Sequence, residues 1–228
     1  MKKIFNCLTV ALVGLMIAAC SGGGNEFIKE AESKVEIKED ALWGQLPSLA
    51  DQYKAAKDAM EAAMEKDREE ILKSAKDLGD AMKQGEEKSS KYEAKEAEID
   101  TFYSKKFMDA AAKLKDKEVP CSFDEKLFSS AKITILGAEE TNQSVPSRLV
   151  LKAELVLAYD MTSPYITFDY LNSAGEKGKS SGATYLDKGK KYKAGDKILL
   201  EKGQNGGPLM VYFESLKDFN KIHFSGKK

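Results

Sequence analysis

The chain has 228 residues, of which 36 are lysine or arginine and 37 are aspartate or glutamate, so its formal net charge at pH 7 is −1. Only Arg68 and Arg148 are arginines. Such a balanced chain lacks the basic excess that neutralises phosphates, so we expect no nucleic-acid partner. Its one histidine, His223, leaves no zinc-ligand set and no choice of base for Ser-His-Asp catalysis. We therefore expect no metal, no cofactor and no catalytic residue, with His223 on the solvent face of a strand.

The first twenty residues form a positively charged start, an apolar run and a small-residue stretch that ends in cysteine. Lys2 and Lys3 precede Ile4 to Ile17, which is too short to span a bilayer as a helix. The ending Ile17-Ala18-Ala19-Cys20 resembles the type II signal of bacterial lipoproteins. The resemblance implies that residues 1–19 are removed and that Cys20 carries lipid such as palmitate. An ordinary secretory signal cut after Ala19 is the alternative, and both interpretations export the chain.

The same resemblance implies a location and leaves one thiol. Serine rather than aspartate at position 21 implies the outer membrane of the cell envelope, on either its periplasmic or its surface side. Cys7 leaves with the signal and Cys20 is lipidated, so Cys121 remains alone and no intramolecular disulfide can form. We expect Cys121 to be a small buried apolar residue, although pairing between chains and a nucleophilic role remain alternatives.

Residues 20–47 are expected to form the lipid anchor and a tether. Ser21 to Asn25 is rich in glycine, and the apolar residues from Phe27 to Val35 predict one short helix. Trp43 follows in this segment. We expect its ring to pack on the body of the protein, with ligand stacking as the alternative.

Residues 48–119 are predicted to form a long antiparallel helical hairpin. Apolar residues from Leu49 to Met82 recur at helical spacing, and Asp67 interrupts this stripe. Gly85 suits a C-terminal cap, and Ser90 to Glu93 fits a capping box that starts a second helix, ending near Lys115. Because two amphipathic helices bury only their facing stripes, the remaining edges require a third helix, the C-terminal domain or another chain. A homo-oligomer formed through the hairpin is one of these options.

Residues 120–228 are predicted to form an antiparallel β-sandwich. Alternating apolar residues mark about seven or eight short strands, among them Leu149 to Tyr159 and Ile166 to Tyr170, and Asn172 to Gly175 reads as a hairpin turn. The segment from Phe128 onward is similar to the immunoglobulin-like domains of many bacterial lipoproteins. The fold class expected is therefore α+β with segregated parts, in which the helical hairpin precedes an immunoglobulin-like sandwich.

A possible ligand face follows from the strand alternation. Phe168 is expected in the core, whereas Tyr165 and Asp169 are expected on the solvent face, with Tyr185 beside them. Exposed rings and carboxylates of this kind suit a glycan or a protein partner. The leading hypothesis is a non-enzymatic, membrane-anchored interaction or binding module. A carboxylate-dependent hydrolase acting on envelope or external glycans, and a structural or assembly subunit, are the alternatives.

Overall fold

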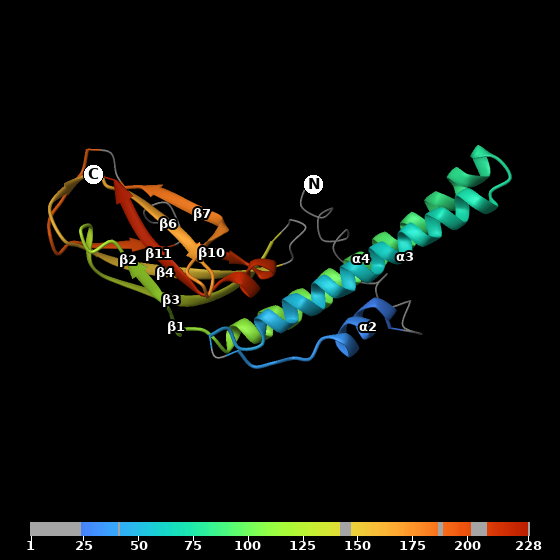
Figure 1. Cartoon of the computed structure of the whole chain (residues 1–228), viewed down its shortest axis with the longest axis horizontal. Helices are drawn as coiled ribbons and strands as arrows, with labels where there is room; N and C mark the ends of the chain where they lie inside the picture. Colours follow the sequence, from blue (N-terminus) through green and yellow to red (C-terminus); the bar gives the residue numbers. More distant parts are fainter. Residues whose placement is uncertain (1–23, 41, 142–146, 187–188, 202–208, 228) are drawn as a thin grey trace, which may run out of the picture. The chain divides into compact units, whose positions relative to one another are not determined.

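The structure is a computed structural model that describes residues 24–40, 42–141, 147–186, 189–201 and 209–227. The predicted signal, Cys20 and the first residues of the tether lie outside the described residues. Helices occupy the N-terminal half and β-sheets the C-terminal part (Figure 1). The predicted α+β class, with helices before strands, is confirmed.

The contacts within the chain divide it into two compact units. One unit comprises Met1–Lys34 and Ala56–Ile99, and the other comprises Val35–Ala55 and Asp100–Lys228. The three helices are α2 (Glu26–Lys34), α3 (Leu46–Ser74) and α4 (Leu78–Ala112). Helices α3 and α4 therefore each contribute residues to both units. None of the helices in the described part of the chain is long and apolar enough to cross a bilayer.

The turn between the two long helices lies earlier than the sequence predicts. It spans residues 75–77, whereas Gly85 and Ser90 both lie inside α4. Asp77 caps α4, because its Oδ1 accepts the N–H of Asp80 at 2.9 Å, and Asp80 Oδ2 in turn accepts the N–H of Lys76 at 3.1 Å. Two aspartates three residues apart thus fix the start of α4. The predicted cap at Gly85 and the capping box at Ser90 are wrong.

Polar contacts explain the interruption of the apolar stripe at Asp67. Its Oδ2 accepts hydrogen bonds from Lys88 Nζ at 2.7 Å and from the Tyr92 hydroxyl at 3.0 Å.

Helix α2 packs on α4, where the Phe27 ring of α2 stacks on Tyr92 with ring centroids 6.4 Å apart. Asn25 Nδ2 donates to the Lys95 carbonyl at 3.0 Å, which fixes the start of α2 on α4.

The helical segments of the other unit belong to an aromatic core. The ring of Phe213 is fully buried, with its centroid 4.4 Å from that of Phe107 on α4 and 5.8 Å from that of Tyr53 on α3. Trp43 is also buried, stacks on Phe219 and donates from Nε1 to the Phe219 carbonyl at 2.8 Å. The expected packing of Trp43 on the protein body is confirmed. These contacts join residues on both sides of position 120.

Two main sheets and a small one make up the C-terminal part. The five-stranded sheet has the order β1-β3-β4-β10, with β9 also pairing with β4, and the four-stranded sheet has the order β2-β11-β6-β7. A third sheet pairs β5 with β8. Among the described strands every pairing is antiparallel except that of β2 with β11. The bounds are β1 (Glu118–Val119), β2 (Cys121–Phe123), β3 (Phe128–Glu140), β4 (Ser147–Leu157), β5 (Met161–Thr162), β6 (Tyr165–Leu171), β7 (Lys177–Tyr185), β8 (Lys191–Tyr192), β9 (Lys197–Leu200), β10 (Leu209–Tyr212), the 3-10 helix η2 (Phe213–Asp218) and β11 (Lys221–Lys227).

On β4 the buried side chains alternate along the strand, as the sequence predicts. Every second residue of β4 from Ser147 to Leu157 is buried. The buried Ser147 Oγ lies 2.8 Å from Ser104 Oγ of α4, which satisfies both hydroxyls. On β6 the outcome differs, because Ile166 is buried whereas Phe168 is only half-buried. The prediction that Phe168 is a core residue is therefore wrong.

Candidate binding face

The candidate site is one side of the four-stranded sheet, which we call the outer face and define by Ser122, Tyr165, Thr167, Asp169, Tyr185, His223 and Ser225. On β6 the opposite side chains point to the interior: Ile166 is buried and the Tyr170 hydroxyl donates to the Met210 carbonyl of the other sheet at 2.9 Å. Burial raises the pKa of Tyr170. Successive strand residues point to opposite faces, so Tyr165, Thr167 and Asp169 share the outer face.

Two tyrosine rings form an aromatic pair at one edge of this face. Tyr165 of β6 is the register partner of Tyr185 of β7, and their ring centroids lie 4.3 Å apart with an interplanar angle of 38°. Tyr185 is 75% exposed, whereas Tyr165 is half-buried. The pair thus presents a large apolar surface with two hydroxyls to solvent, an arrangement typical of recognition surfaces.

A row of polar side chains crosses the same sheet from β2 to β6. Ser122 is the register partner of His223, and His223 is in turn the partner of Asp169. Ser122 Oγ lies 3.0 Å from His223 Nδ1, and Thr167 Oγ1 lies 2.7 Å from Ser225 Oγ. Hydroxyl and imidazole groups in such a row offer both donors and acceptors to a ligand. The predicted solvent-side position of His223 agrees with its half-burial between the buried Ile222 and Phe224.

The order serine, histidine, aspartate across three strands is the residue set of a hydrolytic triad, but its contacts differ from one. Lys177 Nζ binds Asp169 Oδ1 at 2.7 Å, and no hydrogen bond among the described residues joins Asp169 to His223. A triad requires the acid to hold the imidazole in position for proton transfer. The row is therefore better suited to hydrogen bonding than to activation of Ser122.

The structure thus gathers part of the residue set that the sequence singled out. Tyr165 and Tyr185 are in contact, and Asp169 lies on the same face of β6, paired with Lys177. Sequence reasoning missed Ser122 and the placement of His223 beside it. The alternation of Ile222 and Phe224 predicts the side of the strand on which His223 lies. The parallel pairing of β2 with β11, in contrast, is not indicated by residues that are neighbours in the sequence.

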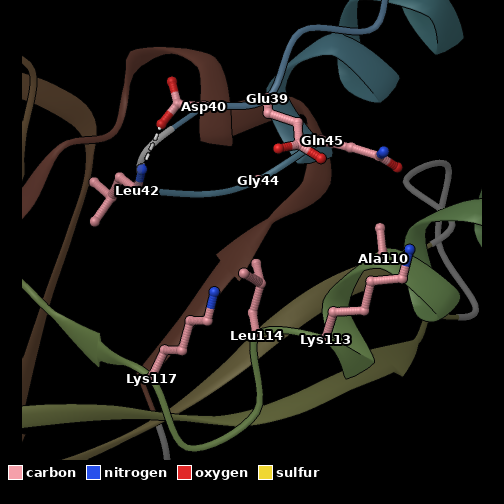
Figure 2. Close-up of a pocket in the computed structure, with 9 residues that line it drawn as sticks. All are labelled: Glu39, Asp40, Leu42, Gly44, Gln45, Ala110, Lys113, Leu114 and Lys117. Atoms are coloured by element: carbon pink, nitrogen blue, oxygen red, sulfur yellow. Dashed lines mark hydrogen bonds between the residues drawn. The ribbon is translucent and has the colours of Figure 1, made fainter.

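A separate cavity lies where the segment before α3 meets the end of α4. It has a volume of about 450 Å³ and is open to solvent (Figure 2). Asp40 Oδ1 accepts the N–H groups of Leu42 at 2.8 Å and Trp43 at 3.2 Å, so this carboxylate holds the loop in shape. The residues that line the cavity are Glu39, Asp40, Leu42, Gly44, Gln45, Ala110, Lys113, Leu114 and Lys117. The lining therefore combines charges of both signs with a short apolar wall.

The remaining reactive groups form no metal centre in the described ranges. No group of three or more histidine, cysteine, aspartate or glutamate side chains there could hold a metal ion. Cys121 is a free, half-buried thiol whose Sγ donates to the Ala131 carbonyl at 3.5 Å. Burial, and secondly the charge of Glu118, raise the pKa of Cys121, which favours the thiol over the nucleophilic thiolate.

Comparisons with known proteins add one solved structure. No family model and no curated protein matches the sequence. The structure titled "Crystal structure of Campylobacter jejuni cj0090" is similar to this chain at 14% sequence identity, over 47% of this chain and 97% of that chain, with a TM-score of 0.23. A likeness at this TM-score supports no argument about fold or function.

Proposed function

We propose that this chain is a lipid-anchored, non-enzymatic binding module of the bacterial cell envelope, and that its outer face binds a glycan. The observation that carries the proposal is the contact between Tyr165 and the largely exposed Tyr185 on the same sheet face as the polar row. Sugar rings have apolar C–H surfaces and polar hydroxyl edges. The tyrosine rings suit the former, and the polar row suits the latter.

The electrostatics of the face also favour a neutral polar ligand. Asp169 is neutralised by Lys177, and the hydroxyls of Thr167 and Ser225 contact each other. A ligand that exchanges hydrogen bonds with hydroxyls leaves no unpaired charge on such a surface, whereas a highly charged ligand would have to displace Lys177 or Asp169.

The immunoglobulin-like arrangement of the C-terminal part belongs to the same proposal. Two observations support it: the two main sheets lie in one compact unit, and hydrogen bonds link them from Tyr170 to the Met210 carbonyl and from Cys121 to the Ala131 carbonyl. Two sheets that pack their apolar faces together leave their other faces for recognition.

The lipid anchor is tested by mass spectrometry of the N-terminus of protein extracted from membranes. We expect Cys20 to be the first residue and to carry acyl chains, because two or three chains give stable anchoring where one does not. A Cys20→Ala chain is expected to lack the lipid. An unmodified Cys20, or a mature chain that starts elsewhere, contradicts this part of the proposal.

Glycan binding is tested with a chain that starts at Ser21, since all described residues follow it. Isolated peptidoglycan sacculi and a panel of soluble oligosaccharides serve as probes, with affinity measured by co-sedimentation and calorimetry. We expect Tyr185→Ala to weaken binding about tenfold, which corresponds to about 1.4 kcal/mol. The matched control Tyr185→Phe keeps the ring and is expected to bind within about twofold of the parent.

Two results would contradict the proposed glycan binding at this face. Unchanged affinity in Tyr185→Ala would remove the aromatic pair from the site. Binding of a protein from the envelope extract, with no binding to any glycan probe, would keep the face but replace the ligand.

A further inference from the structure

The hairpin tip, defined as residues 61–91, exposes more apolar surface than a solvated pair of helices requires. Leu72 is 71% exposed, Leu78 77%, Met82 59% and Met64 42%. In residues 61–98, all of which the structure describes, no residue is buried. Helix α2 contacts α4 at Tyr92 and Lys95, which lie outside the tip. Since most helical stability in proteins comes from burial of an apolar face, this tip lacks its packing partner.

Helix geometry places these four side chains on one side of the hairpin. Ile71 on α3 and Ala81 on α4 are less exposed than Leu72 and Met82, which follow them directly. In an antiparallel pair of right-handed helices, residues one position after the contact positions of each helix point to the same side. Met64 follows the half-buried Ala63 in the same way, and Leu78 lies one turn before Met82. The tip therefore has one apolar side.

The heights of the residues along the hairpin are fixed by its cross-contacts. Because Asp67 of α3 binds Lys88 of α4, positions that lie equally far toward the turn are level with each other. Counting from this contact, Leu72 is level with Lys83 and Arg68 with Glu87, so Met82 and Glu86 each lie within one residue of those levels. Arg68 and Glu86 each follow a contact position, so they lie on the apolar side as well. No described contact joins them within the chain, since Arg68 is bound only by Glu65 of its own helix, at 3.8 Å.

We propose that the hairpin tip docks on the tip of a second copy of this chain and forms a four-helix bundle. A two-fold axis parallel to the helices places α3 of one copy against α4 of the other at equal height. Leu72 then meets Met82 of the second copy, and Arg68 meets Glu86 of the second copy, and the symmetry repeats both contacts. The apolar side is thus complementary to itself, because apolar residues meet apolar residues and opposite charges meet each other. This self-complementarity favours a second copy over an unrelated partner.

This arrangement is independent of the proposed glycan binding and is consistent with a lipid anchor. A two-fold axis along the helices directs both hairpins the same way, so both chains are able to reach one membrane surface. Four-helix bundles in which neighbouring helices are antiparallel bury apolar residues that flank the contact positions of each hairpin.

Light scattering coupled to size-exclusion chromatography of the chain from Ser21 tests the proposal. We expect a mass twice that of the monomer at high protein concentration, falling to the monomer mass on dilution. The double variant Leu72→Gln with Met82→Gln is expected to be a monomer throughout, with unchanged helical circular dichroism because both side chains are exposed in the monomer. The matched control Ile37→Gln, which alters an exposed apolar residue outside the hairpin, is expected to dimerise like the parent.

A charge exchange tests the orientation. Arg68→Glu and Glu86→Arg are each expected to weaken dimerisation, whereas the combined Arg68→Glu, Glu86→Arg chain is expected to recover it. A parent chain that stays monomeric at every concentration overturns the proposal, as does a dimer that survives the Leu72 and Met82 changes. Binding of the monomer to lipid vesicles, abolished by the same changes, would assign the apolar side to a membrane and likewise overturn it.

Discussion

Substitution of Phe213 by alanine tests whether the ends of the long helices and the β-region share one core. The ring is fully buried and contacts Phe107 at 4.4 Å and Tyr53 at 5.8 Å between centroids. Removal of a buried phenylalanine leaves a cavity lined by both helices and costs about 3–5 kcal/mol. With a typical urea dependence of about 2 kcal/mol per molar for a protein of this kind, the midpoint of unfolding is expected to fall by about 2 M.

The assay has a built-in reporter, because Trp43 is the only tryptophan and packs on Phe219 just after η2. Tryptophan fluorescence reports the aromatic core, and far-ultraviolet circular dichroism reports helices and strands together. We expect both to show the loss of stability in Phe213→Ala. The matched control is Phe102→Ala, which removes a half-buried ring and is expected to cost much less. Equal losses in the two variants would refute the shared core.

The remaining predictions concern glycines and titrating groups. A Cβ at Gly182 would lie 2.2 Å from Cζ of Phe168, so Gly182→Ala is expected to cost about 1–3 kcal/mol in thermal unfolding. Gly85 lies inside α4 with nothing within 4 Å of a Cβ, so Gly85→Ala is expected to stabilise by about 0.5–1 kcal/mol, and a loss of stability there would show that the helix is interrupted. Hydrogen bonds from Lys88 and, secondly, from Tyr92 hold the pKa of Asp67 below its ordinary value. The stability that this carboxylate contributes is therefore fully present above its unfolded pKa of about 4, and it is lost as the pH falls through the lower pKa of the folded state. We expect Asp67→Asn to remove this pH dependence. Burial and the hydrogen bond to Asp67 raise the pKa of Tyr92 to about 12, so we expect an absorbance titration to show one phenol that ionises near that pH and that is missing in Tyr92→Phe.

The sequence predicted the fold where the information is local. The change from helical to alternating spacing near Pro120, the buried face of β4 and the turn from Asn172 to Gly175 all follow from neighbouring residues, and the structure has them. The helical turn was misplaced because two aspartate side chains compete for backbone N–H groups more effectively than Gly85 ends a helix.

The candidate site was predicted in part for the same reason. Alternation placed Tyr165 and Asp169 on one face, which needs only their own strand. The contact between Tyr165 and Tyr185 and the row from Ser122 to Asp169 depend on register between strands that are distant in sequence, and register is set by packing of the whole sheet. The exposure of Met64, Leu78 and Met82 was hidden because a helical stripe shows which residues align, not whether anything covers them.

The central claim, that the outer face is the binding surface, is tested most directly by nuclear magnetic resonance. An isotope-labelled chain from Ser21 is titrated with soluble oligosaccharides released from peptidoglycan, and backbone amide shifts are mapped residue by residue. We expect the largest shifts at Tyr165, Tyr185 and His223, with none at the hairpin tip. Shifts confined to Glu39 and Lys113 at the cavity, or no shift with any oligosaccharide, would contradict the claim.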